Sequence, residues 1–384
     1  MNIVVAVDSF KGSLTSLQVG EEVKKGLLNA GLDVNVEVVG IADGGEGTVD
    51  ALLHANEGEK VYAHVHDPLM KSREALYGIL NINGENHVVI ESAQSTGLDL
   101  VPNDLRNPLK VNSFGLGELI KDAVLKGHRK FYLTLGGSAT NDAGTGMLQA
   151  LGWKFFDDDG GLIGIEQNPL ISVADIDDSG VLPELKECTF TVISDVTNPF
   201  YGERGAVKVF SRQKGATSQQ MVVLEEAMVR FASLIDQKYN CKVQDISGAG
   251  AAGGLGGTLA CVLGAEILPG IDLIIDLVGL ENKIQKADLV ITGEGSLDGQ
   301  SIMGKVPVGV AKLAKKHHKL VVGIAGRIDT DLGEINKYLD AVFSIQTECR
   351  TLEEAMEYSV TARQIQVTTE QIIRLIQAAK KFES

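Results

Sequence analysis

Carboxylates, lysines, hydroxyls and glycines gather directly after several apolar segments of this chain. The clearest case is DSFKGSLT, residues 8 to 15, which follows the apolar segment Ile3 to Val7. A carboxylate can hold Mg²⁺ or accept the proton of an attacking hydroxyl, and a lysine can neutralise charge on a transferring phosphoryl group. These residue types together are typical of a phosphoryl-transfer site.

Similar polar segments follow the other apolar segments. Turn formation alone would explain any one of them. Together they favour the rim of an active site, because ligands bind beyond the carboxyl ends of the strands in open α/β sheets. The segments are IADGGEGT (41–48), ESAQSTG (91–97), GGSATNDAGTG (136–146), SDVTNP (194–199), TGEGSLDGQS (292–301) and AGR (325–327).

Segment 136–146 is a candidate phosphate-binding loop. It follows an apolar strand-like segment and leads into MLQALGW, which predicts a helix. Glycines let the backbone approach a phosphate closely, and the free amides at a helix start bind anions. A helix cap formed by Asn141 or Asp142 is the structural alternative.

Two further glycine-containing segments match known spacings only in part. Segment 247–257 contains GxGxxG but lacks a clear strand before it, so it is weak support for a nicotinamide cofactor. Segment 299–306, GQSIMGKV, has the spacing of a P-loop, but Val306 stands where the magnesium-binding Ser or Thr belongs. It is therefore not a standard P-loop, although Lys305 could still reach a phosphate.

Several charged residues at or near predicted strand ends have the chemistry to bind metal, act as a base or neutralise phosphate. For any single carboxylate, a helix cap is an equally good explanation. The carboxylates are Asp8, Asp43, Asp195, Glu294 and Asp298, and the cations are Lys11, Lys305 and Arg327.

Apolar strand-like segments alternate with helix-like ones, which predicts an α/β architecture with doubly wound parallel sheets. Capping-box pairs at Thr15/Gln18 and Thr351/Glu354 indicate helix starts. We predict one discontinuous domain of residues 1–67 and 285–384 and an inserted α/β domain of residues 68–284. The predicted strands are 3–7, 34–39, 87–90, 131–135, 190–193, 289–292, 320–324 and 341–345.

Composition narrows the class of protein. The net charge of −16 over 384 residues argues against general binding to nucleic acid or to an anionic membrane. The four cysteines lie far apart without a CxxC pair, so we expect neither a disulfide framework nor a zinc site, and a reduced, cytoplasmic protein. No apolar run approaches the ~20 residues of a membrane span.

With DSFKGSL, ADGGEGT, GGSATNDAG and GEGSLDGQS in this order, the chain resembles the bacterial glycerate kinase family essentially from end to end. The resemblance implies phosphorylation of D-glycerate with ATP and Mg²⁺, most often to 2-phosphoglycerate, with 3-phosphoglycerate as the alternative. It also implies two α/β domains, the discontinuous one Rossmann-like, with the active site in the cleft between them. A nicotinamide-dependent dehydrogenase and a non-catalytic small-molecule sensor are the rival interpretations. A homo-oligomer is compatible with the sequence.

The roles that we assign to the motif positions are hypotheses. For catalysis they are Asp195 as general base, Lys11, and Asp298 as the second candidate base. Ser9, Ser13, Asp8 and Arg327 would contact the substrate, and Asp43 and Glu294 would serve Mg²⁺. The nucleotide phosphates would be held by Gly136, Gly137, Ser138, Asn141, Asp142 and Lys305.

Overall fold

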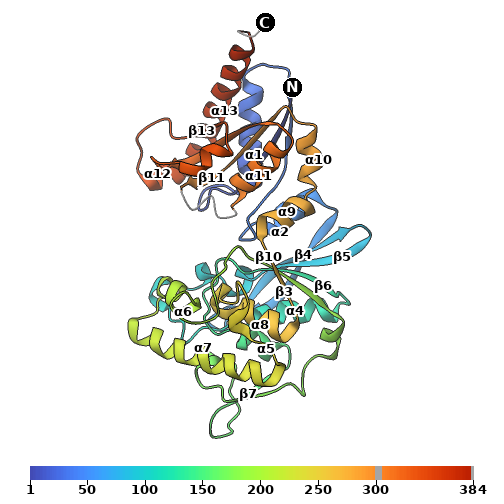
Figure 1. Ribbon diagram of the computed structural model, residues 1–384, viewed down its shortest axis with the longest axis vertical. Helices are drawn as coiled ribbons and strands as arrows, with labels where there is room; N and C mark the ends of the chain where they lie inside the picture. The colour runs from blue at the N-terminus through green and yellow to red at the C-terminus, as the bar shows by residue number, and fades with distance from the viewer. Residues whose placement is uncertain (299–304, 382–384) are drawn as a thin grey trace. The chain divides into compact units, whose positions relative to one another are not determined.

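The computed structural model describes residues 1–298 and 305–381, and it divides into two compact units (Figure 1). Unit 1 comprises Met1–Asp43, Asp50–Asn56 and Gly270–Ser384, and unit 2 comprises Gly44–Val49 and Glu57–Pro269. Both units combine helices with sheets that are mostly parallel, which confirms the α/β prediction. No helix among the described residues is long and apolar enough to cross a membrane.

Unit 1 is built on a five-stranded parallel sheet in the order β13-β12-β11-β1-β2. This is the doubly wound order 2-1-3-4-5 when the strands are counted within the unit. All eight predicted strands of the chain are present in the structure, five of them here. The unit 1 strands are β1 (Asn2–Val7), β2 (Asn35–Val38), β11 (Leu289–Leu297), β12 (Leu320–Ile328) and β13 (Ala341–Ser344).

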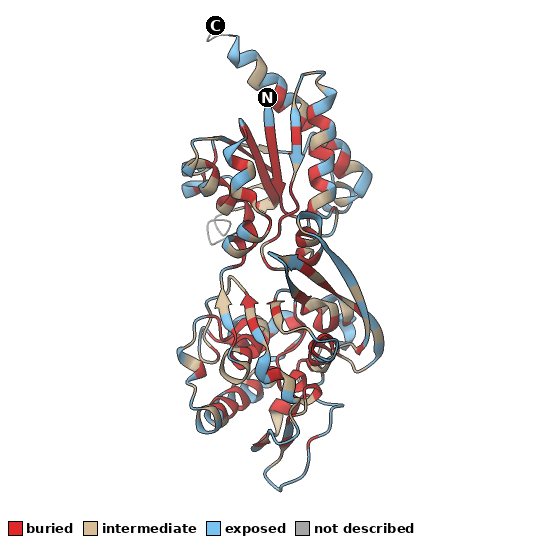
Figure 2. Cartoon of the chain, turned by 90° about the vertical axis from the view of Figure 1, so that its right-hand side faces the viewer, coloured by how far each residue is buried: buried red, intermediate tan, exposed pale blue. Residues whose placement is uncertain are grey.

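Helices cover both faces of this sheet, as the apolar strands require. Ile3, Val5 and Val7 of β1 share one core cluster with apolar residues of α1 (Ser16–Asn29) and α13 (Tyr358–Lys380). Val4 and Ala6 of β1 point to the opposite face, where α11 (Val306–Lys316) packs against β11 and β12. Figure 2 shows the strands at the centre of the sheet as buried. The remaining helices of the unit are α2 (Thr48–Ala55, which begins in unit 2), α9 (Gly270–Leu277), α10 (Leu280–Gln285) and α12 (Leu352–Met356).

Unit 2 contains a six-stranded mixed sheet in the order β10-β9-β6-β5-β4-β3. Its strands β5, β6, β9 and β10 run parallel, while β3, β4 and β5 form an antiparallel meander. The sheet strands are β3 (Gly58–His66), β4 (Ser72–Ile82), β5 (Glu85–Glu91), β6 (Lys130–Thr134), β9 (Thr189–Ile193) and β10 (Glu266–Leu268), and a small hairpin is formed by β7 (Lys154–Phe156) and β8 (Asp175–Asp177). The helices are α3 (Ala93–Thr96), α4 (Phe114–Leu125), α5 (Thr145–Ala150), α6 (Ala206–Phe210), α7 (Ser218–Tyr239) and α8 (Ala251–Leu263).

Two segments lie on the other side of the domain borders that the sequence suggested. Strand β3 pairs with β4, with Tyr62 opposite Leu76, so residues 58–66 belong to the sheet of unit 2. Helices α9 and α10 pack against α11, so residues 270–284 belong to unit 1. A cleft between the two domains as the place of the active site stays a prediction.

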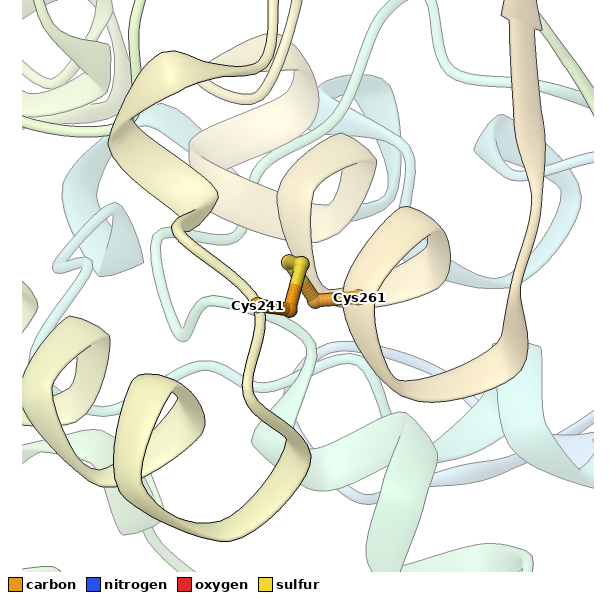
Figure 3. The surroundings of a disulfide bond; sticks show 2 residues. All are labelled: Cys241 and Cys261. Atoms are coloured by element: carbon orange, nitrogen blue, oxygen red, sulfur yellow. A yellow bond between two sulfur atoms is a disulfide. The ribbon is translucent and has the colours of Figure 1, made fainter.

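The expectation that the cysteines form no disulfide is wrong for one pair. Cys241, just after α7, and Cys261, on α8, are joined by a disulfide with 5.6 Å between their Cα atoms (Figure 3). They are 20 residues apart in the sequence, but α7 and α8 pack together, which brings the two thiols into bonding distance. Cys188 and Cys349 are free.

We predict that replacing both bridged cysteines, Cys241→Ser with Cys261→Ser, lowers the free energy of unfolding by about 3 kcal/mol. This is the loop-closure contribution expected for a loop of this length. Urea denaturation followed by far-ultraviolet ellipticity measures it, with the exposed Cys349→Ser as control. Four free thiols in the oxidised wild-type protein, or a double variant as stable as the control, would contradict the prediction.

Candidate functional site

A cavity of about 480 Å³ lies in unit 1 at the carboxyl ends of β1, β11 and β12. These strands are parallel neighbours, so the polar residues at and beyond their carboxyl ends meet at one edge of the sheet. Eight of the residues predicted for the site line the cavity: Asp8, Ser9, Lys11, Ser13, Asp43, Glu294, Lys305 and Arg327.

The loop after β1 is held in one tight shape. Phe10 and Leu14 form an isolated bridge, with Phe10 N donating to Leu14 O at 2.9 Å. Gly12 between them has φ of +79°, a backbone conformation that favours glycine, and the end of the Met356 side chain packs over it. Thr15 then caps α1 with the predicted capping box to Gln18. This turn directs Ser9, Lys11 and Ser13 towards the cavity.

The electrostatics of the cavity centre on Asp8, which is only 5% exposed. Burial raises the pKa of Asp8, and repulsion from Asp43 and Glu294 raises it further, to about 7. A hydrogen bond from Ser9 N at 2.6 Å and the charge of Lys11 oppose this rise. Three carboxylates and three cations line the cavity, and among the carboxylates Asp8 is the one whose negative charge is disfavoured by burial and by its neighbours.

Cations with accessible side chains lie beside these carboxylates. Lys11 and Arg327 are exposed, and Nζ of Lys305 lies 3.4 Å from Oε2 of Glu294, which is 7% exposed. Carboxylates, cations and hydroxyls in one cavity can bind a divalent cation, a phosphate and a small hydroxy acid.

The C-terminal part of the chain supplies a wall of the cavity that the sequence analysis missed. Thr361 Oγ1 of α13 lies 2.7 Å from Oγ of Ser13, so this helix fixes the Ser13 hydroxyl. Glu354 completes the predicted capping box at the start of α12. A capping box predicts where a helix begins, but it does not predict which residues the helix contacts. The lining residues that were missed are Phe10, Gly295, Ser296, Gly326, Ile345, Gln346, Leu352, Ala355, Met356 and Thr361.

In unit 2, the predicted phosphate loop follows β6 and leads into α5, as expected. Gly136 and Gly137 are exposed, whereas Ser138 is buried and its Oγ accepts a hydrogen bond from Thr140 N at 3.1 Å. Asn141 is fully buried, and neither polar atom of its side chain has a hydrogen-bond partner in the described part of the chain.

Asp142 forms a helix cap, which was the alternative to phosphate binding in the sequence analysis. Its carboxylate is fully buried and accepts hydrogen bonds from N and Oγ of Ser113 at 2.8 and 2.7 Å. It also accepts from N of Gly144 and Gly146 at 3.2 and 3.1 Å. These bonds join the starts of α4 and α5, and they engage the carboxylate that was predicted to hold phosphate or metal.

The two candidate bases lie in different units. Asp195 follows β9 in unit 2, and Asp298 follows β11 in unit 1, and both are half-buried. Asp298 does not line the cavity of unit 1.

The glycine-rich segment 247–257 does not form a dinucleotide fingerprint. A 3₁₀ turn, Val243–Asp245, precedes it in place of a strand, and its glycines serve close packing. A Cβ on Gly253, for example, would lie 2.3 Å from O of Thr140. Residues 299–304 of the P-loop-like segment lie outside the described residues; Lys305 precedes α11 as its N-cap.

Comparison with known proteins gives one consistent answer. The model of the glycerate kinase family matches residues 3–377. The chain is 44% identical to a protein named Glycerate 2-kinase from Escherichia coli (strain K12), covering 92% of this chain and 93% of that one. It is 41% identical to a protein named Glycerate kinase from Bacillus subtilis (strain 168), covering 99% of both.

A solved structure leads to the same family. The crystal structure described as a "putative glycerate kinase 2" from Salmonella typhimurium LT2 matches with a TM-score of 0.86 and 40% identity over 99% of both chains. The family model and the relatives cover nearly the whole chain, including every strand end that lines the cavity. The chain belongs to the glycerate kinase family and is a kinase.

Proposed function

We propose that the chain transfers the γ-phosphoryl group of ATP to the 2-hydroxyl of D-glycerate with the help of Mg²⁺. The observation that carries the proposal is the convergence of carboxylates, cations and hydroxyls in the cavity of unit 1. The name of the Escherichia coli relative, Glycerate 2-kinase, supports the 2-hydroxyl over the 3-hydroxyl.

Lys11 and Arg327 are the groups that we assign to negative charge on the substrate. Both are exposed at the cavity, so they can meet an incoming carboxylate or phosphoryl group without first breaking a buried ion pair. Ser9 and Ser13 would donate hydrogen bonds to the same groups, and Thr361 sets the position of the Ser13 hydroxyl. Asp8 would remain at the base of the cavity, where its ionisation responds to the ligands bound.

The cavity fits Mg²⁺ held by Asp43 and Glu294. Mg²⁺ usually binds to one or two carboxylates together with substrate phosphates and water. This suits a cavity in which repulsion between carboxylates raises the pKa of Asp8. Such an ion neutralises charge on the phosphates when it is bound. Lys305, beside Glu294, would contact a phosphate from the same side.

For the nucleotide phosphates we propose the loop of residues 136–146. The exposed backbone of Gly136 and Gly137 allows a phosphate to approach closely. The side-chain amide of Asn141 has no hydrogen-bond partner among the described residues and could donate to that phosphate. Ser138 and Asp142 are engaged inside the protein, so we assign to both the shaping of the loop and no direct contact.

Asp195 remains the proposed general base, with Asp298 second. Either one could accept the hydroxyl proton of glycerate, and the cavity geometry of unit 1 alone does not rank them. A cytoplasmic location and assembly into a homo-oligomer stay predictions.

Lys11→Met should lower kcat/KM by at least about 100-fold. A cation that meets charge developing in the transition state contributes roughly 3 kcal/mol, and an exposed lysine that does not contributes less than about 1 kcal/mol. Steady-state kinetics with glycerate and ATP measures the change. Lys337→Met, which removes an exposed ion pair with Glu334, is the matched control and should leave kcat/KM unchanged. Equal values for the two variants would remove Lys11 from the site.

Asp195→Asn should lower kcat by about 10² to 10⁴-fold, the range for loss of a general base, with a smaller effect on KM. Asp158→Asn, at an exposed position of unit 2, controls for loss of charge alone. Turnover of Asp195→Asn within about twofold of the wild type would show that Asp195 is not the base, and Asp298→Asn would then be the variant to measure.

The product tests the proposed reaction as a whole. Enolase acts directly on 2-phosphoglycerate but not on 3-phosphoglycerate, so absorbance of phosphoenolpyruvate should rise when enolase alone is added. A rise only after addition of phosphoglycerate mutase would assign the 3-hydroxyl. Intact ATP with folded protein and D-glycerate would refute the proposal and favour another hydroxy acid or a sensor.

A further inference from the structure

Lys214 is a buried lysine that the proposed reaction leaves without a role. It ends the 3₁₀ turn Arg212–Lys214 in unit 2 and is only 3% exposed. Its Nζ donates a hydrogen bond of 2.6 Å to the backbone oxygen of Thr140, inside the loop of residues 136–146. Burying an ammonium group is costly unless it is paired, so such a lysine calls for an explanation.

The charge that faces Lys214 is that of Asp142, two residues after Thr140. Burial lowers the pKa of Lys214 to about 8, and the field of Asp142 opposes that change. The Asp142 carboxylate is itself bonded to the starts of α4 and α5. A buried lysine and a buried carboxylate therefore anchor the two ends of the short segment Thr140–Asp142.

Helix α8 holds the same loop by a second set of hydrogen bonds. Ala143 has φ of +52°, an unusual conformation for a residue with a Cβ, and its N donates to O of Gly253 at 3.0 Å. Oγ1 of Thr258 donates to O of Ala143 at 2.5 Å. Thus Lys214 and α8 hold two residues of the loop, Thr140 and Ala143, from different elements.

Between these two residues lies Asn141, the buried residue whose side-chain amide has no partner among the described residues. Buried amides are nearly always hydrogen-bonded, so an unpaired one held in a strained loop indicates a group kept for a ligand. Without the hydrogen bonds from Lys214 and from α8, the loop could move so that the Asn141 amide finds a hydrogen-bond partner inside the protein.

We infer that Lys214 is a positioning residue for ATP binding: it holds the Thr140 carbonyl and so keeps the loop of residues 136–146 in the shape that receives the nucleotide phosphates. This inference rests on the proposed function, because that loop is the proposed phosphate site. Lys214 acts through the loop and does not touch the substrate.

The test compares Lys214→Met, which keeps the length of the side chain but removes the donor, with the conservative Lys214→Arg. ATP binding is measured by isothermal titration calorimetry without glycerate, and KM for each substrate is measured separately. We expect Lys214→Met to weaken ATP binding and to raise the KM for ATP by about tenfold, because the loop is less preorganised. The KM for glycerate should change by less than about twofold. Lys214→Arg should recover part of the loss. Lys208→Met, at an exposed ion pair with Glu203, is the control.

A second variant keeps the test decisive if Lys214→Met does not fold. Thr258→Val removes the hydrogen bond to the Ala143 carbonyl with little change in the shape of the side chain, and it should also weaken ATP binding selectively. ATP binding unchanged in a folded Lys214→Met or Thr258→Val protein, an equal rise of both KM values, or a rise of the glycerate KM alone would overturn the inference. Failure of the wild type to phosphorylate glycerate while it binds ATP would instead refute the proposed function.

Discussion

The structure of the candidate site depends on one unfavourable interaction, the burial of the Asp8 carboxylate close to Asp43 and Glu294. Burial and repulsion together raise the pKa of Asp8 to about 7, so the cavity accommodates the charge of this carboxylate poorly. A cation or a proton relieves the repulsion. The fold keeps the three carboxylates together because Asp8 and Asp43 follow β1 and β2, Glu294 lies near the end of β11, and β1 is the parallel neighbour of both other strands. The site is thereby prepared for positively charged or metal-bound ligands.

The loop after β6 uses the same strand-end position with different electrostatics. Here the charged groups, Lys214 and Asp142, are turned inward and shape the backbone, and the exposed surface consists of Gly136 and Gly137. In the cavity of unit 1, by contrast, charged side chains themselves form the surface. The strand ends of unit 1 would thus neutralise the charge of the ligands with side chains, while the loop after β6 would offer backbone donors to phosphate.

The features that the sequence predicted are those that depend directly on strand order. Apolar strands alternating with helices required parallel sheets, and parallel sheets bring Asp8, Glu294 and Arg327 to one edge. The sequence could not predict contacts made across the fold. The wall formed by Met356 and Thr361, the bond between Cys241 and Cys261, and the burial of Lys214 all join segments whose proximity no local pattern encodes. Asp142 illustrates a remaining ambiguity, since its sequence context suited both a cap and a ligand, and the structure has the cap.

The measurement that tests this account most directly is a carbon-13 NMR titration of the aspartate carboxyl groups, with the Asp8 signal assigned by its loss in Asp8→Asn. In a chelating buffer the account predicts a pKa near 7 for Asp8, and a lower value once Mg²⁺ is added with ATP and glycerate. An Asp8 pKa near its ordinary value of 3.8 in the free protein, or one that does not respond to those ligands, would contradict it.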